Sequence, residues 1–183
     1  MFQLARKISV KELPHLVLLL DGKVIHYKDP QFSAVKILEF VRRKFPWRMV
    51  ESVDDTNIDT FLNGWNLDNR VRVLLFGKTD VIRLRYLTTA FKYRNRALIG
   101  YVKLQGPNTD KVVDRFKVPT TGVDTLLIFQ ENVDVPVASV STKDISLATL
   151  FEMVEANQFL QLPRLSSQDI FDQLCPGLIT IFY

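Results

Sequence analysis

Cysteine and histidine carry the chemistry that is easiest to constrain in this chain, because it has so few of them. A single cysteine, Cys175, excludes a disulfide within the chain and a cysteine-rich zinc site. The two histidines, His15 and His26, form no recognisable metal-ligand spacing with Asp, Glu or Cys. Glycine-rich phosphate loops and the G-x-S-x-G motif of serine hydrolases are also absent from the sequence. We therefore expect no bound metal and no cofactor.

A second set of residues with binding chemistry is basic and interleaved with aromatic residues. It comprises Arg70, Arg72, Arg83, Arg85, Lys92, Arg94 and Arg96. On a helix, Arg85 and Lys92 share a face that could bind acidic peptides, lipid phosphates or RNA. An ordinary solvated face is the alternative. The formal charge is only +4, with 20 acidic residues spread among 24 Lys and Arg, so the composition does not favour specific binding to nucleic acid.

The elements that must position these residues alternate between strands and helices. Residues 71–77 form a compact apolar run bounded by polar residues, which is typical of a buried central strand. Residues 80–94 follow as a predicted helix, with Leu84, Leu87 and Phe91 on one face. The flanking predictions are strands at 48–53 and 97–104, a helix at 55–65 with Asp54 or Asp55 as its N-cap, and a short helix that begins at Pro107.

Two stretches of the chain share one pattern at an offset of 110 positions. His15–Gly22 lies over Thr125–Asn132, and each is an apolar strand that ends in a turn and continues into a second strand. An amphipathic helix follows in both copies. Its apolar positions are Ala34, Ile37, Leu38, Val41 and Phe45 in the first copy and Leu147, Leu150, Phe151 and Val154 in the second. Residues 168–174 resemble the start of a third copy.

The order of elements, three strand–helix pairs followed by a strand hairpin and a helix, is similar to the thioredoxin fold and covers residues 48–162. We therefore predict an α/β protein with a mixed central sheet flanked by helices. Residues 47–163 are expected to form one complete thioredoxin-like module, and residues 1–46 the C-terminal half of a preceding one. Residues 164–183 are expected to be a tail with an atypical ending, or the start of a further module.

The sequence from 76 to 106 and from 151 to 176 also resembles a co-chaperone family, the DnaJ homologues of subfamily C. The resemblance implies a parent protein anchored in the endoplasmic-reticulum membrane, with a J domain and thioredoxin-like segments, that serves proteostasis and autophagosome formation. Neither the His-Pro-Asp motif of a J domain nor an apolar run long enough to span a bilayer occurs here. We therefore expect a fragment or truncated isoform, soluble by itself, in the endoplasmic reticulum or the cytoplasm.

The thioredoxin resemblance implies a redox site where the second strand meets the second helix, with a Cys-x-x-Cys motif activated by the helix N-terminus. The matching positions here are Gly77, Lys78, Thr79, Asp80, Val81 and Ile82. None is a cysteine, so thiol–disulfide exchange is closed at this junction. The family also has a cis-proline before the fourth strand. Pro14 matches it in the partial module, where it is expected to be cis or else to shape a turn, and Asp124 replaces it in the complete module.

These observations favour a binding module over an enzyme. We predict a redox-inactive thioredoxin-like domain that binds protein clients or co-chaperone partners. The candidate binding surface consists of Arg83, Arg85, Lys92, Arg94 and Arg96. One alternative is a thiol–disulfide oxidoreductase that acts through Cys175, brought to the site by a dimer or a third module. Another is a surface that binds anionic lipid or nucleic acid through the same basic residues.

Overall fold

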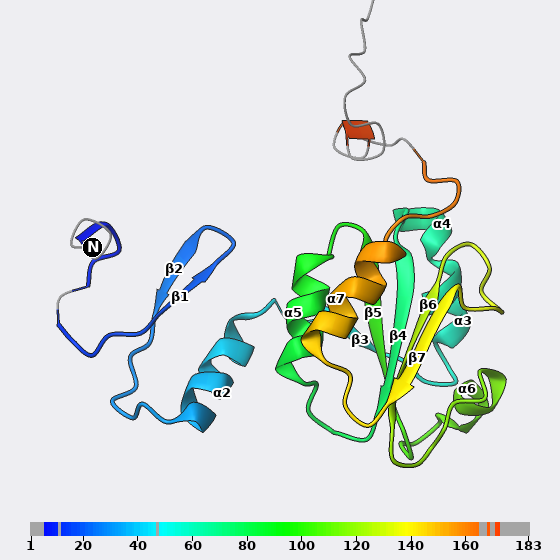
Figure 1. The fold of residues 1–183 in the computed structure, drawn as a ribbon, viewed down its shortest axis with the longest axis horizontal. Coiled ribbons are helices and arrows are strands. Elements are labelled where there is room, and N and C mark those ends of the chain that lie inside the picture. The colour runs from blue at the N-terminus through cyan, green and yellow to red at the C-terminus, as the bar shows by residue number, and fades with distance from the viewer. Residues whose placement is uncertain (1–5, 11, 47, 165–167, 169–170, 173–183) are drawn as a thin grey trace, which may run out of the picture. The chain divides into compact units, whose positions relative to one another are not determined.

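The computed structural model describes residues 6–10, 12–46, 48–164, 168 and 171–172. The chain divides into two compact units, residues 1–47 and residues 48–183, which are labelled by their elements in Figure 1. We call them the first unit and the second unit. The division lies one residue beyond the expected boundary between residues 46 and 47.

The first unit is a β-hairpin followed by a helix. Strands β1 (Val17–Leu20) and β2 (Lys23–His26) pair antiparallel. The turn between them places Asp21 and Gly22 at φ 52° and 74°, which is the left-handed conformation that a two-residue hairpin loop requires. Helix α2 (Ala34–Lys44) follows.

Packing within the first unit is sparse. Ser33 caps α2 by accepting a hydrogen bond from the Lys36 amide at 3.3 Å. Tyr27 is the one buried hydrophobic residue among the described residues of this unit, and its ring packs edge-on against Phe40 of α2. No residue of α2 is buried. The hairpin and the helix therefore share a small contact rather than a core.

The second unit is built on a five-stranded mixed sheet with the strand order β3-β5-β4-β6-β7. Its strands are β3 (Val50–Ser52), β4 (Val71–Gly77), β5 (Ala97–Lys103), β6 (Asp124–Phe129) and β7 (Ala138–Thr142). The first three run parallel, whereas β6 and β7 are antiparallel to their neighbours. Every residue of the central strand β4 is buried, as an apolar run covered on both faces requires.

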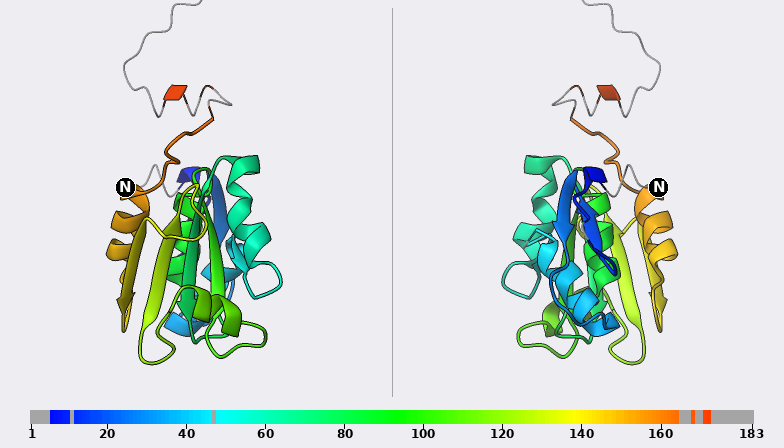
Figure 2. Two further views of the ribbon diagram at one scale, coloured as in Figure 1. Left: turned by 90° about the vertical axis from the view of Figure 1, so that its right-hand side faces the viewer. Right: turned by 90° about the vertical axis from the view of Figure 1, so that its left-hand side faces the viewer.

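Helices cover both faces of this sheet, as the edge-on views in Figure 2 show for α3 and α7. The helices are α3 (Ile58–Asn63), α4 (Trp65–Asp68), α5 (Leu84–Lys92), α6 (Asp110–Arg115) and α7 (Leu147–Ala156). One core cluster joins the sheet to α5 and α7, and a second joins it to α3 and α6. The observed order of elements confirms the predicted α/β class.

Two of the helices predicted on either side of residues 80–94 begin later than expected. The helix expected at 55–65 begins at Ile58 with Asn57 as its N-cap, because the Asp54 carboxylate instead accepts a hydrogen bond from the Thr56 amide in a turn. The helix expected at Pro107 begins at Asp110. Asn108 has φ 56°, a left-handed conformation that cannot belong to a right-handed helix, so the helix starts only after it.

Candidate functional site

The junction between β4 and α5 occupies the position of the redox site predicted from the thioredoxin resemblance. The predicted helix at 80–94 in fact begins at Leu84, so residues 78–83 connect the strand to the helix as an irregular segment. Lys78, Asp80 and Val81 are exposed, and Thr79 and Ile82 are partly buried. The Asp80 carboxylate pairs with the Lys103 ammonium. The junction therefore offers ammonium, hydroxyl, carboxylate and apolar groups, and no thiol.

Side chains from neighbouring strands fill the space beside Gly77. The Tyr101 hydroxyl donates a hydrogen bond to the Thr79 carbonyl at 2.9 Å and lies 3.2 Å from the Thr79 hydroxyl. A Cβ atom on Gly77 would lie 2.8 Å from the Tyr101 hydroxyl oxygen and 3.3 Å from Oδ1 of Asp124. Glycine is thus required here because two polar side chains approach the backbone closely.

Asp124, which replaces the expected cis-proline, is the first residue of β6 and is 5% exposed. Its Oδ2 accepts hydrogen bonds from Arg83 Nη1 at 2.7 Å and from the Tyr86 hydroxyl at 2.9 Å. Burial and then the negative charge of Asp124 raise the pKa of Tyr86 to about 12. Tyr86 therefore stays a neutral hydrogen-bond donor at physiological pH, and Arg83 supplies the charge that balances the buried carboxylate.

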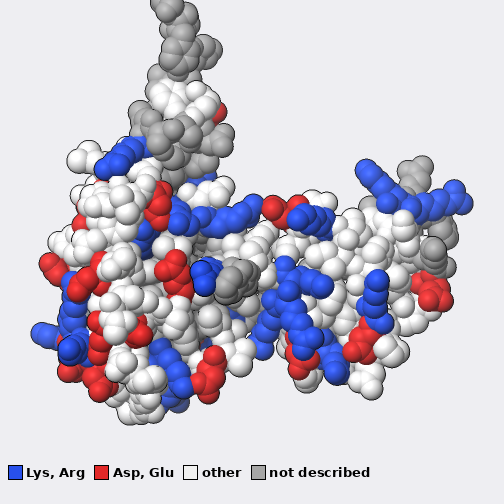
Figure 3. All heavy atoms as spheres, turned by 180° about the vertical axis from the view of Figure 1, so that it is seen from behind, with Lys and Arg blue, Asp and Glu red and all other residues white. Residues whose placement is uncertain are grey.

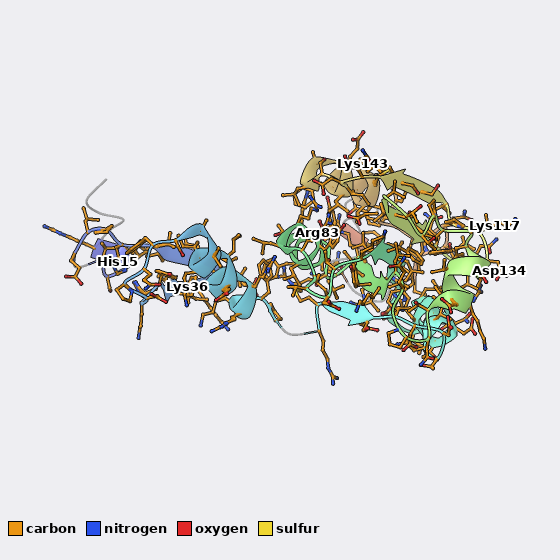
Figure 4. The ribbon with its side chains drawn as sticks, turned by 90° about the horizontal axis from the view of Figure 1, so that it is seen from below. His15, Lys36, Arg83, Lys117, Asp134 and Lys143 are labelled. Atoms are coloured by element: carbon orange, nitrogen blue, oxygen red, sulfur yellow. The ribbon has the colours of Figure 1, made fainter. Side chains whose placement is uncertain are left out.

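The ionic contacts continue from Arg83 to the loop that precedes α7. Arg83 Nη1 lies 2.9 Å from Asp144 Oδ1, and Arg85 also contacts Asp144 through a short hydrogen bond. The hydrogen bond from Arg85 is the main reason that the pKa of Asp144 is lowered. We call these residues (Arg83, Arg85, Tyr86, Asp124 and Asp144) the Asp124 cluster. Figure 4 labels Arg83 beside α5, from which the cluster reaches both β6 and the β7–α7 loop.

The residues of the predicted basic surface make contacts within the second unit, and several of these contacts are with carboxylates. Arg83 and Arg85 belong to the Asp124 cluster. Lys92 lies 3.7 Å from Glu155 and over the ring of Phe151 in α7. On the face of the second unit seen in Figure 3, acidic side chains lie among the basic ones.

The other members of the predicted surface are also engaged. Arg94 lies over the Phe91 ring and donates to the Phe91 carbonyl at 3.0 Å. Arg96 bonds to Gln158 and lies over Phe159. Cation–π attraction to the rings fixes the orientation of these two guanidinium groups, although it leaves their positive charge unchanged.

Arg72, which the sequence groups with the same basic set, is a core residue at 2% exposure. Its guanidinium donates to the Phe61 carbonyl at 2.7 Å and to the Asp68 carboxylate at 2.9 Å. Asp68 and Arg72 are only four positions apart, but the chain turns at Asn69 between α4 and β4, so helical spacing could not indicate this pair. The contacts of Tyr101, Tyr86 and Asp144 join distant segments, and no local pattern pointed to them.

In the first unit, the Leu13–Pro14 peptide bond is cis and Pro14 is exposed. His15 Nε2 lies 2.8 Å from His26 Nδ1, which is a hydrogen bond between the start and end of the hairpin. Within the described part of the chain, no three His, Cys, Asp or Glu side chains are grouped to hold a metal ion. Cys175 lies outside the described residues. No helix in the described ranges combines the length and the apolar character of a membrane span.

Comparison with known proteins identifies a family. The family model described as DJC16, thioredoxin-like domain 2, matches residues 52–157. The DnaJ homolog subfamily C member 16 of Gallus gallus is 30% identical over 95% of this chain, and that of Homo sapiens is 28% identical over the same share. The chain spans only 22% of the length of each of these relatives.

Solved structures support the fold. Crystal form I of ERdj5 has a TM-score of 0.60 and 12% identity, covering 94% of this chain and 23% of ERdj5. Crystal form II has a TM-score of 0.53 and 13% identity, covering 89% of this chain and 22% of ERdj5. With its predicted element order confirmed and more than half its length matched by the family model, the chain belongs to the family of the second thioredoxin-like domain of DnaJ homolog subfamily C member 16.

Proposed function

We propose that this chain is a redox-inactive, protein-binding module of a DnaJ co-chaperone of the endoplasmic-reticulum membrane, and that the parent protein serves proteostasis and autophagosome formation. The observation that carries the proposal is the composition of the β4–α5 junction. Residues 77–82 contain no thiol, and the side chains of Tyr101 and Asp124 lie close to Gly77 in this junction. Without a thiolate nucleophile, no mixed disulfide can form at this junction.

Protein binding is the function that such a module retains. Membership of a DnaJ homologue family supports a role beside other chaperone components. Three of the five predicted surface cations, Arg83, Arg85 and Lys92, are paired with carboxylates, which weakens the case for binding of anionic lipid or nucleic acid. The partners are therefore expected to be polypeptides.

Reduction of insulin by dithiothreitol tests both parts of the proposal in one assay. The freed B chain precipitates after a lag. A dithiol–disulfide oxidoreductase shortens this lag, whereas a protein that binds the unfolded B chain lengthens it. We expect the chain to lengthen the lag at equimolar concentration, and a Cys175→Ser variant to lengthen it equally.

The other outcomes are decisive as well. A shortened lag that Cys175→Ser restores to the uncatalysed value would establish an oxidoreductase that acts through Cys175. A lag equal to that of an inert control protein at the same concentration would contradict protein binding.

A further inference from the structure

The hairpin of the first unit repeats the sequence pattern of the β6–β7 hairpin of the second unit, but its residues are less buried. Leu16–Leu19 corresponds to Leu126–Phe129 at the offset of 110 positions. In the second unit these four residues are at most 5% exposed. In the first unit Leu19 is 63% exposed, and the other three are only partly buried. Among the residues that the structure describes, the elements that cover β6 have no counterpart over β1.

The first missing element is a neighbouring strand. The Leu16 carbonyl accepts a hydrogen bond from the Tyr27 amide, so the main-chain groups of Leu16 point toward β2. In an antiparallel pair these groups point alternately toward and away from the partner strand, so those of Val17 and Leu19 point away from β2. Among the described residues, β1 pairs with β2 alone. At the matching edge of β6, strand β4 pairs antiparallel, with Leu74 opposite Leu127.

The second missing element is a helix on one face of the hairpin. Residues opposite each other in an antiparallel pair share a face, so Leu19 and Val24 lie on the face opposite from the one where Tyr27 meets α2. Leu19 and Val24 are 63% and 41% exposed. On the matching face of the second unit, Leu127 and Phe129 belong to a core cluster with residues of α3 and α6, and the Phe116 ring that follows α6 lies 5.0 Å from the Phe129 ring.

The open edge also lacks the features that usually prevent strand pairing. Natural edge strands carry charges, prolines or bulges that discourage a further strand, whereas β1 consists of one valine and three leucines. An uncharged edge next to an exposed apolar face is a surface suited to β-strand addition.

We propose that the β1 edge and the face of Leu19 and Val24 form a docking site for a helix–strand segment of the α3–β4 kind from outside these 183 residues. Its amphipathic helix covers the exposed face, and its apolar strand runs antiparallel to β1. A second copy paired through β1 would fill the edge but leave the face uncovered, so it fits less well. This inference rests on the proposed protein-binding function and specifies the surface and the partner.

A synthetic peptide with the sequence of residues 57–78, which spans α3 and β4, is a suitable probe. Amide hydrogen exchange of the full chain is measured with and without the peptide. At a free peptide concentration about ten times the dissociation constant, exchange at Val17 and Leu19 is expected to slow about tenfold. Leu19→Glu should abolish this protection. The matched variant Leu38→Glu, at another exposed leucine of the first unit, should retain it.

Several outcomes would overturn the docking site. One is that the peptide leaves exchange at Val17 and Leu19 unchanged, and another is that Leu19→Glu and Leu38→Glu lose protection equally. A third is that light scattering shows a dimer in which the β1 amides are already protected without the peptide. If the peptide fails to dock while the chain still delays insulin precipitation, the docking site is wrong and the protein-binding function stands. If the peptide docks but the chain does not delay insulin precipitation, the docking site stands and binding of unfolded protein clients is wrong.

Discussion

The two hairpin–helix segments of this chain share one sequence pattern but differ in burial. In the second unit, Leu150 and Val154 of α7 are fully buried against a five-stranded sheet in which β4 is the central strand. When the two helices are aligned on their first residues, Ala34 and Leu147, the positions of α2 that match Leu150 and Val154 are Ile37 and Val41, and both are only partly buried. A local pattern thus specifies the hairpin and the helix, whereas the core depends on the strands and helices that a complete module adds.

The largest expected contrast is between Phe129→Ala and Leu19→Ala, at matching positions of the repeat. Phe129 is fully buried, so its truncation leaves a cavity and should lower the free energy of unfolding by about 3–5 kcal/mol. Leu19 is 63% exposed, and its truncation should change that free energy by no more than about 0.5 kcal/mol. Urea unfolding followed by circular dichroism measures both. Similar losses at the two positions would contradict the contrast.

A smaller effect is expected where the second unit buries a charge. Asp68→Asn removes the ion-pair partner of Arg72, which is 2% exposed. Breaking a fully buried pair costs about 3–5 kcal/mol. Because the Asp68 side chain is 28% exposed, we expect a loss of about 2–3 kcal/mol at neutral pH. Urea unfolding of Glu39→Gln in α2, an exposed carboxylate of the first unit, is the matched control and should show almost no loss.

The same pair predicts an acid dependence. Burial by itself would raise the pKa of Asp68, but the hydrogen bonds and charges of Arg72 and Arg70 outweigh burial and lower it. The stabilisation is therefore present above the unfolded-state pKa of about 4 and is lost as pH falls through the lower folded-state pKa. The stability difference between the wild-type chain and Asp68→Asn should shrink over that interval. A pH-independent difference would be evidence against the ion pair.

The smallest predicted effect concerns the Asp124 cluster. Tyr86→Phe removes one hydrogen bond to the buried carboxylate and should cost about 1–2 kcal/mol. Since the pKa of Tyr86 is raised to about 12, its contribution is present below about pH 10 and is lost as pH rises through the folded-state value. Between neutral pH and alkaline pH, the free energy of unfolding should therefore fall less in the phenylalanine variant than in the wild-type chain. Identical alkaline profiles would show that Tyr86 does not ionise on unfolding.

How far the sequence predicts the structure depends on whether a signal is local. The apolar run at 71–77 predicted β4 with its observed bounds, because a strand buried on both faces is apolar along its length. In β4 every position but one fits this pattern. The exception, Arg72, was misassigned to the surface because its partners at Phe61 and Asp68 are contributed by α3 and α4. The predicted start of α6 was too early because Asn108 adopts a left-handed conformation, which the residue type alone does not specify.

The candidate site shows the same division. The absence of cysteine at residues 77–82 was evident from the sequence, as was the replacement of proline by Asp124. The hydrogen-bond partners of Asp124 were not evident from the sequence. Arg83 and Tyr86 lie about forty positions away and contact Asp124 only because α5 packs on the sheet.

Native-state amide hydrogen exchange of the unmodified chain tests the contrast between the two units most directly. The amide of Leu127, which lies on the β4 side of β6, should exchange only through global unfolding of the second unit. The amides of Val17 and Leu19, on the open side of β1, should exchange close to the rate of an unstructured peptide. Protection at Val17 and Leu19 equal to that at Leu127 would contradict the account, because the first unit would then already be complete without a partner.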